Sequence, residues 1–64
     1  MKNNITEFRK LRGLTQLQIA EALCVDYTQV QRWERDRRTP SVETAIRLAR
    51  ILKTTVEKLF IVDD

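Results

Sequence analysis

Residues 16–35 read QLQIAEALCVDYTQVQRWER, and this stretch decides the fold. Apolar side chains recur at helical spacing in two runs, over residues 16–23 and over residues 27–35. Asp26 stands before the second run as a candidate N-cap, so the turn between the runs must be tight. Two short helices joined by a turn of about three or four residues form a helix-turn-helix unit, and residues 16–35 fit that unit.

Helical spacing continues on both sides of this unit. Gly13 is expected to end a first helix as its C′ residue, Ser41 to cap a fourth helix, and Thr54 or Thr55 to cap a short fifth one. The expected apolar stripes are Ile5, Phe8 and Leu11 in the first helix and Ala45, Leu48, Ala49 and Leu52 in the fourth. Because the alternation typical of strands is absent, the sequence predicts an all-α fold, a compact five-helix bundle that occupies residues 1–64 as one domain.

The composition limits what so small a protein can do. With 64 residues, the chain has room for one domain and a small core. It contains no His and one Cys, which excludes imidazole catalysis, a disulfide within the chain and a Cys-based zinc site. Asp63 and Asp64 are expected to be a solvated tail and not metal ligands. We therefore expect that the protein is not an enzyme and holds no metal or cofactor.

The second helix of the unit exposes the side chains that carry the functional interpretation. Tyr27, Thr28, Gln31 and Arg32 have the spacing i, i+1, i+4, i+5 and share one face, whereas Trp33 points into the core. A phenol, a hydroxyl, an amide and a guanidinium can read base edges in the major groove of DNA, where Arg32 suits guanine and Thr28 a thymine methyl group. The alternative is an ordinary solvated polar face.

Positive charge gathers beside that face. Twelve Lys and Arg residues against nine Asp and Glu give a net charge of +3, which favours an anionic partner. Arg35, Arg37 and Arg38 lie at and just after the end of the unit's second helix. Thr15 and Gln16 lie at the start of the unit's first helix, where backbone N–H groups favour a phosphate. Phosphate contacts would then bracket the base-reading face and fix its register. The alternative is an arginine cluster that only keeps a loop soluble.

Several short motifs resemble those of one known family. They are Leu14-Thr15-Gln16, Ile19-Ala20, Val30, Trp33-Glu34-Arg35 and Pro40-Ser41. In this combined spacing, over about residues 5–60, the chain resembles the Cro/repressor-type helix-turn-helix domains, also called XRE-like or lambda-repressor-like. The resemblance implies a five-helix bundle that binds operator DNA, usually as a dimer, with its third helix in the major groove.

The resemblance also implies roles for single residues. It implies base contacts from Tyr27, Thr28 and Arg32, with Gln31 and Gln29 as further candidates, and phosphate contacts from Thr15, Gln16, Arg35, Arg37 and Arg38. Of the two further candidates, we expect Gln31 to contact a base and Gln29 a phosphate. It implies a structural ion pair between Arg9 and Glu34 that ties the first helix to the end of the third. Where many family members have a glycine suited to positive φ, this chain has Cys24, Asp36 and Lys53, so we expect a strained turn at Cys24. The Cys24 thiol is expected to be buried or half-buried.

A C-terminal apolar run predicts how the protein assembles. Leu59, Phe60, Ile61 and Val62 either fold back on the core or form a dimer seam, and we favour the symmetric seam because one module buries little DNA. We therefore expect a homodimer, at least on DNA, that reads a pseudo-palindromic operator as a transcriptional regulator, in the manner of a Cro-like phage or mobile-element repressor.

Two further expectations complete this interpretation. No membrane partner or small-molecule effector is expected, and the protein is expected in the cytoplasm, with the nucleoid of a bacterial or phage-infected cell. The alternative function is that of a protein-interaction module, such as an antitoxin or adaptor, that keeps the same bundle.

Overall fold

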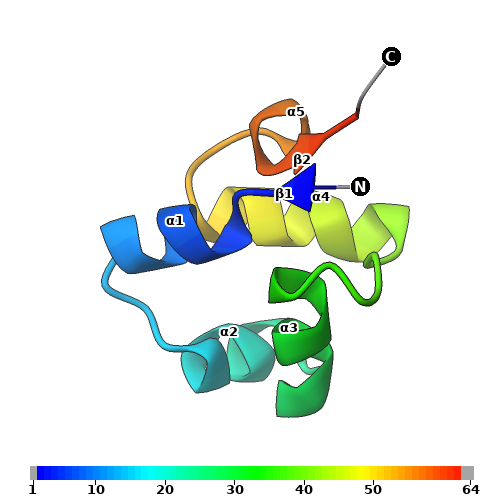
Figure 1. Cartoon of the computed structure of the whole chain (residues 1–64). Helices are drawn as coiled ribbons and strands as arrows, with labels where there is room; N and C mark the ends of the chain where they lie inside the picture. Colours follow the sequence, from blue (N-terminus) through cyan, green and yellow to red (C-terminus); the bar gives the residue numbers. More distant parts are fainter. Residues whose placement is uncertain (1, 63–64) are drawn as a thin grey trace.

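A computed structural model describes residues 2–62 of the chain (Figure 1). Within these residues the elements follow one another as β1 (Lys2–Asn3), α1 (Ile5–Leu11), α2 (Gln16–Leu23), α3 (Tyr27–Glu34), α4 (Val42–Ile51), α5 (Val56–Leu59) and β2 (Phe60–Ile61). Figure 1 shows α2 and α3 at one end of the molecule, α5 and the two strands at the other, and α1 and α4 between them. This arrangement confirms the predicted all-α five-helix bundle.

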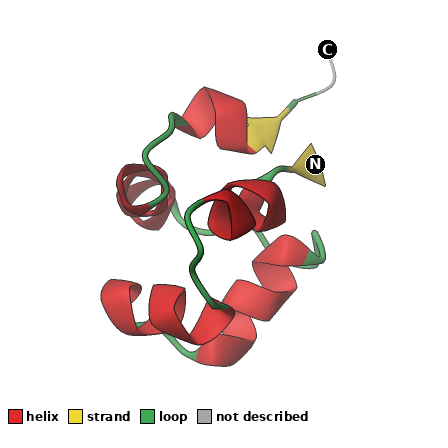
Figure 2. Ribbon diagram, turned by 90° about the vertical axis from the view of Figure 1, so that its left-hand side faces the viewer, coloured by secondary structure: helices red, strands yellow, loops and turns green. Residues whose placement is uncertain are grey.

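The two short strands are an addition to that prediction. β1 and β2 pair in antiparallel fashion, with Lys2 opposite Ile61 and Asn3 opposite Phe60 (Figure 2). Just beyond the ladder, the backbone N–H of Asn4 donates to the carbonyl of Leu59 at 2.8 Å. Two-residue strands are too short to show an alternating pattern, so the sequence contains no sign of this pairing. The ladder joins segments from the two ends of the chain.

The core lies between the helices and is almost entirely aliphatic. It consists of Ile5, Ile19, Ala20, Leu23, Val30, Trp33, Leu48, Ala49, Leu52 and Leu59. The expected stripe of α4 is buried throughout, as is Trp33. Leu11 corrects the prediction for α1, because its side chain is 69% exposed. At about 100° per residue, a position six residues after Ile5 has rotated well away from the buried stripe, and Leu14 packs against the core instead.

Four helices end in the same way, on a residue in the left-handed region. Gly13 follows α1 with a φ of 69°, and non-glycine residues take this conformation after the other three: Cys24 at 56°, Asp36 at 59° and Lys53 at 55°. After each of them, the next backbone N–H donates to the carbonyl five residues earlier, from Leu14 to Arg9, Val25 to Ala20, Arg37 to Arg32 and Thr54 to Ala49. These are the bonds of a Schellman motif. The expected strain at Cys24 therefore recurs at two further helix ends.

Side-chain caps begin three of the helices. Thr15, Ser41 and Thr55 each accept a hydrogen bond from the backbone N–H three residues later, so Thr55 and not Thr54 caps α5. Asp26 occupies the N-cap position of α3 in extended backbone, as expected, but its side chain makes no capping hydrogen bond. The start of α3 is instead fixed by the preceding turn and by burial of Val30 and Trp33.

Candidate nucleic-acid interface

The outward face of α3 carries the four side chains named from the sequence. Tyr27, Thr28 and Arg32 are exposed, and Gln31 is half-buried. Val30 and Trp33 lie on the opposite face, in the core. We call the four outward side chains the recognition face. Gln29 lies at the edge of this face and is half-buried.

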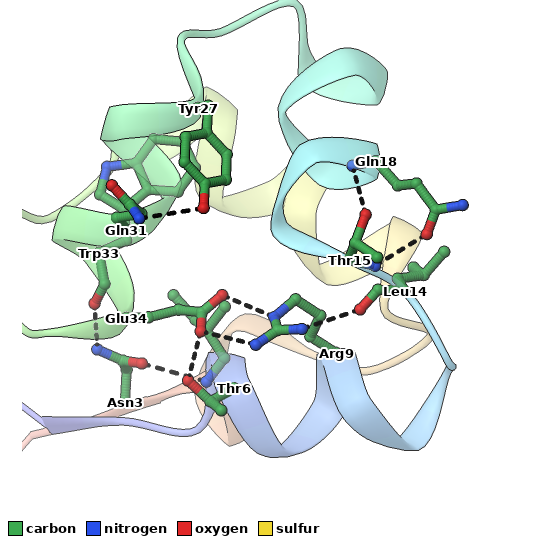
Figure 3. Close-up of polar contacts among 11 residues, drawn as sticks. Asn3, Thr6, Arg9, Leu14, Thr15, Gln18, Tyr27, Gln31, Trp33 and Glu34 are labelled. Atoms are coloured by element: carbon green, nitrogen blue, oxygen red, sulfur yellow. Dashed lines mark hydrogen bonds and ion pairs between the residues drawn. The ribbon is translucent and has the colours of Figure 1, made fainter.

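Two members of the recognition face are joined to each other. The amide Nε2 of Gln31 donates to the phenol oxygen of Tyr27 at 3.1 Å, one helical turn away (Figure 3). This bond uses neither the phenol proton, nor the second N–H of Gln31 Nε2, nor the amide oxygen of Gln31. The pair therefore keeps donors and an acceptor that could be matched by those of a base edge.

The start of α2 lies next to the recognition face. Thr15 and Gln18 form a reciprocal capping box, in which Gln18 N–H donates to Thr15 Oγ1 at 3.1 Å and Thr15 N–H to Gln18 Oε1 at 2.8 Å. The remaining first-turn N–H groups, those of Gln16 and Leu17, have no acceptor within the helix by geometry. An open hollow of about 620 Å³ connects this helix end with the start of α3, where Tyr27 lines it. A phosphate in that hollow would meet the positive end of the helix dipole.

Three arginines follow the C-terminal end of α3. Arg35, Arg37 and Arg38 are all exposed on the loop that leaves α3, and the loop is anchored where Pro40 is buried. We call Arg35, Arg37 and Arg38 the arginine margin; in the sequence they follow the C-terminal end of the recognition face.

A nearly buried ion pair braces α3 from behind. Arg9 Nε donates to Glu34 Oε2 at 2.8 Å and Arg9 Nη2 to Glu34 Oε1 at 3.1 Å, and the two side chains are only 14% and 6% exposed. Thr6 Oγ1 also donates to Glu34, at 2.7 Å, and Arg9 Nη1 donates to the carbonyl of Leu14 at 3.0 Å (Figure 3). Burial raises the pKa of Glu34, but the side-chain hydrogen bonds from Arg9, Thr6 and Gln16 and the charge of Arg9 outweigh it, so the pKa of Glu34 is lowered.

The polar contacts behind α3 include residues that sequence reasoning missed. Thr6 holds the carboxylate together with Arg9, and Asn3 Nδ2 donates to the carbonyl of Trp33 at 2.7 Å. A single Asn or Thr near the start of a chain has no distinctive spacing, so no sequence signal points to either residue. Cys24 also differs from expectation, because its thiol is exposed at the turn between α2 and α3.

The C-terminal run lies partly inside the molecule. Leu59 is buried in the core of its own chain and Phe60 is half-buried, whereas Ile61 and Val62 are exposed. Beside them is a groove of about 340 Å³, which we call the apolar groove; its apolar lining includes Val42, Ile46, Val56, Phe60 and Val62. Thr39 and Pro40 of the α3 exit loop also line it, so the apolar groove lies close to the arginine margin. Asp63 and Asp64 lie outside the described residues.

No helix among residues 2–62 has the length and apolar character needed to cross a membrane. The longest, α4, has ten residues.

Comparison with known proteins gives a consistent result. The sequence model of a family described as "Helix-turn-helix" matches residues 5–59. A protein of Archaeoglobus fulgidus is 34% identical over 64 residues, which are all of this chain and 91% of that protein. A protein of Methanothermobacter thermautotrophicus is 38% identical over 65 residues, and one of Methanocaldococcus jannaschii is 31% identical over 64; the alignments cover 94% and 97% of those proteins. All three are described as uncharacterized HTH-type transcriptional regulators.

Proposed function

The chain belongs to the helix-turn-helix family of transcriptional regulators, and on this premise we propose that it reads a specific double-stranded DNA operator with α3 in the major groove. The observation that carries the proposal is the recognition face: four side chains with base-reading chemistry lie outward on a helix whose opposite face is buried. Arg32 is assigned to guanine, to which a guanidinium binds in bidentate fashion. Thr28, Tyr27 and Gln31 are assigned to the neighbouring bases.

Phosphate contacts on both sides would hold α3 in register. On one side we assign them to Thr15 and Gln16 at the start of α2, and on the other to the arginines of the α3 exit loop, with Gln29 as a further contact at the edge of the face. The exposed positions of Arg35, Arg37 and Arg38 support this assignment. Such contacts supply affinity for any duplex, whereas the recognition face supplies the preference for one sequence.

We also propose that two copies bind together on a pseudo-palindromic site. The surface that supports a homodimer is the apolar groove with the exposed Ile61 and Val62; Phe60 contributes from its edge, while Leu59 supports the segment from within the core. Apolar surface of this kind is stabilised when a partner removes it from water. Residues Thr39 and Pro40 of the α3 exit loop line the same groove. A twofold seam there would have to place both copies of α3 on one side of the dimer, as two major grooves about 34 Å apart require. Bound in this way, the dimer would repress by occupying the operator and so excluding other proteins from DNA sites that overlap it.

Selection from a pool of randomised duplexes tests this function. The expected result is enrichment of one pseudo-palindromic sequence whose half-sites are separated by about one helical turn. The control is Arg32→Ala, which should select a sequence with one position relaxed in each half-site. A pool that shows no enrichment even at low salt, where DNA binding is strongest, would contradict the proposal. That result would favour the second candidate, a protein-interaction module, for which the apolar groove is the supporting observation.

A further inference from the structure

The N-terminal segment connects two parts of the molecule that the chain places far apart. On one side, β1 pairs with β2, Asn4 N–H donates to the carbonyl of Leu59 at 2.8 Å, and Asn4 Nδ2 donates to the carbonyl of Lys58 at 3.1 Å. On the other side, Asn3 Nδ2 donates to the carbonyl of Trp33, in the last turn of α3, at 2.7 Å. Two adjacent asparagines therefore hold different elements, Asn4 the end of α5 and Asn3 the end of α3.

The amide of Asn3 has only one way to satisfy its two partners. The Trp33 carbonyl can only accept, so it requires the NH₂ group, and the backbone N–H of Ile5 donates to Asn3 Oδ1 at 3.1 Å (Figure 3). This side chain therefore ties the start of α1 to the end of α3 in one fixed orientation. Its own backbone is held in the ladder opposite Phe60.

The C-terminal half of α3 carries Gln31 and Arg32, two of the four side chains of the recognition face. Trp33 directly follows Arg32, and the carbonyl of Arg32 itself accepts the N–H of Arg37 at 2.8 Å. One residue later, the side chain of Glu34 is held by Arg9 and Thr6. The Glu34 contacts hold α3 through a side chain, whereas Asn3 holds its backbone, and a guanidinium that binds guanine in bidentate fashion tolerates little displacement of that backbone.

We propose that Asn3 is a positioning residue for DNA recognition: its amide fixes the C-terminal end of α3, so that sequence discrimination by Arg32 and Gln31 depends on it. The inference rests on the proposed function. Asn3 itself touches no DNA, and its effect is carried through the Trp33 carbonyl. A further consequence is that β2, which belongs to the proposed dimer seam, and the recognition helix α3 share one anchor in β1.

The test uses four substitutions in two matched pairs. Asn3→Ala removes both hydrogen bonds of the side chain, and Asn3→Asp keeps the acceptor for Ile5 N–H but removes the donor to Trp33. Asn4→Ala and Asn4→Asp make the same chemical changes one residue away, at a side chain bonded to Lys58 and not to α3. Asn3→Asp and Asn4→Asp also change the net charge of the protein by the same amount. Fluorescence of Trp33, the one tryptophan of the chain, reports the folded fraction of each variant.

The measured quantity is the ratio of the dissociation constants for a random duplex and for the selected sequence. Both Asn3 variants should lower this ratio about three- to tenfold, the size expected for one lost hydrogen bond, with the loss confined to the base positions read by Arg32 and Gln31. Both Asn4 variants should leave the ratio within about twofold of the wild type. The salt dependence of binding to random duplex should be the same within each matched pair, since no phosphate contact is lost.

Two results would overturn the inference while leaving the proposed function intact. One is a wild-type preference that survives both Asn3 substitutions. The other is an equal loss in all four variants, which would indicate general destabilisation of the N-terminal segment. If the folded wild-type protein preferred no sequence at all, the proposed function would fail first, and the role of Asn3 in recognition would fail with it.

Discussion

The recognition face and the apolar groove are both open to solvent, but they are built from opposite chemistry and held by different forces. The recognition face carries a phenol, a hydroxyl, an amide and a guanidinium, with arginines at its margin, and the apolar groove is lined largely by aliphatic side chains. Behind α3 lies a nearly buried ion pair with its own hydrogen bonds, whereas α5 has Leu59 in the aliphatic core and two uncharged hydrogen bonds from Asn4 at its end.

The two proposed partners, DNA and a second copy of the chain, would require these two kinds of surface. A polyanion is bound by charge and by polar groups that remain hydrated until contact, whereas a second copy of the protein is bound by removing apolar surface from water. Changes at one surface should therefore leave the other function intact. The polar support of α3 should also respond to single substitutions and to pH in ways that the apolar side does not.

The largest expected effect concerns the ion pair behind α3. Glu34→Ala leaves the guanidinium of Arg9 without its partner in a site that is 14% exposed, and removal of one member of such a pair costs about 3–5 kcal/mol of the free energy of unfolding. Urea unfolding followed by Trp33 fluorescence measures this loss. The control is Glu43→Ala, which breaks the exposed pair between Glu43 and Arg47 on α4 and should cost about 0.5 kcal/mol or less. Similar losses in the two variants would contradict the claim that the nearly buried pair behind α3 contributes more stability than an exposed pair.

The next effect concerns the apolar groove. Val62→Asp places a carboxylate in the proposed dimer seam. Desolvation of that charge should weaken dimerisation at least about tenfold, or 1.4 kcal/mol. The affinity of each protomer for random duplex should fall by no more than the added negative charge accounts for. Sedimentation equilibrium, with and without DNA, measures the association. Leu11→Asp is the matched control, because Leu11 and Val62 are both 69% exposed and Leu11 lies on α1. A wild type that stays monomeric both free and on DNA would refute the seam.

A smaller effect is expected at the turn between α2 and α3. Cys24 adopts a φ of 56°, which glycine takes without steric cost, so Cys24→Gly should raise the free energy of unfolding by up to about 1 kcal/mol. Gly13→Ala makes the reverse exchange at the end of α1, where φ is 69° and nothing lies within 4 Å of an added Cβ, and should lower it by a similar amount. Thermal unfolding of both variants measures these two changes in stability. Destabilisation by Cys24→Gly would show that the thiol contributes more than its backbone conformation costs.

The smallest expected effect is on the pH dependence of stability, which should reflect the carboxylate behind α3. Because the pKa of folded Glu34 is lowered, the carboxylate contributes stability that is present above the ordinary pKa of a glutamate and is lost as pH falls through the lowered value. Glu34→Gln removes this titration, so the variant should lose less stability than the wild type between pH 7 and pH 3. Urea unfolding at the two pH values, with Glu43→Gln as control, tests the assignment. An equal slope for the wild type and Glu34→Gln would place the acid-sensitive group elsewhere.

Elements that follow from local pattern could be predicted from the sequence. Helical period located all five helices, and the buried stripe of α4 and the core position of Trp33 followed from the same spacing. Three positive-φ positions were indicated by the glycines that the family has there, which are Cys24, Asp36 and Lys53 in this chain.

Features that depend on contacts across the chain could not be predicted. The β1–β2 ladder and the bond from Asn3 to Trp33 join residues that are far apart in sequence, and no periodicity records such a contact. The exposed position of Cys24 depends on how its neighbours cover the turn between α2 and α3. The exposed position of Leu11, in contrast, follows from helical geometry, which turns a residue six positions after Ile5 away from the buried stripe. The outward side chains of α3 were found from spacing, whereas the polar contacts of Thr6 and Asn3 behind that helix were not.

The central claim is that α3 reads bases while the flanking arginines bind phosphates, and paired arginine substitutions test it most directly. Affinities of Arg32→Ala and Arg37→Ala are measured on the selected and on random duplexes over a range of salt, with Arg47→Ala on α4 as a charge-matched control. We predict that Arg32→Ala loses about 1–3 kcal/mol of discrimination at one base position, and that Arg37→Ala weakens all duplexes alike and reduces the salt slope by about one unit. Equal losses on selected and random DNA for Arg32→Ala and Arg37→Ala would contradict the account.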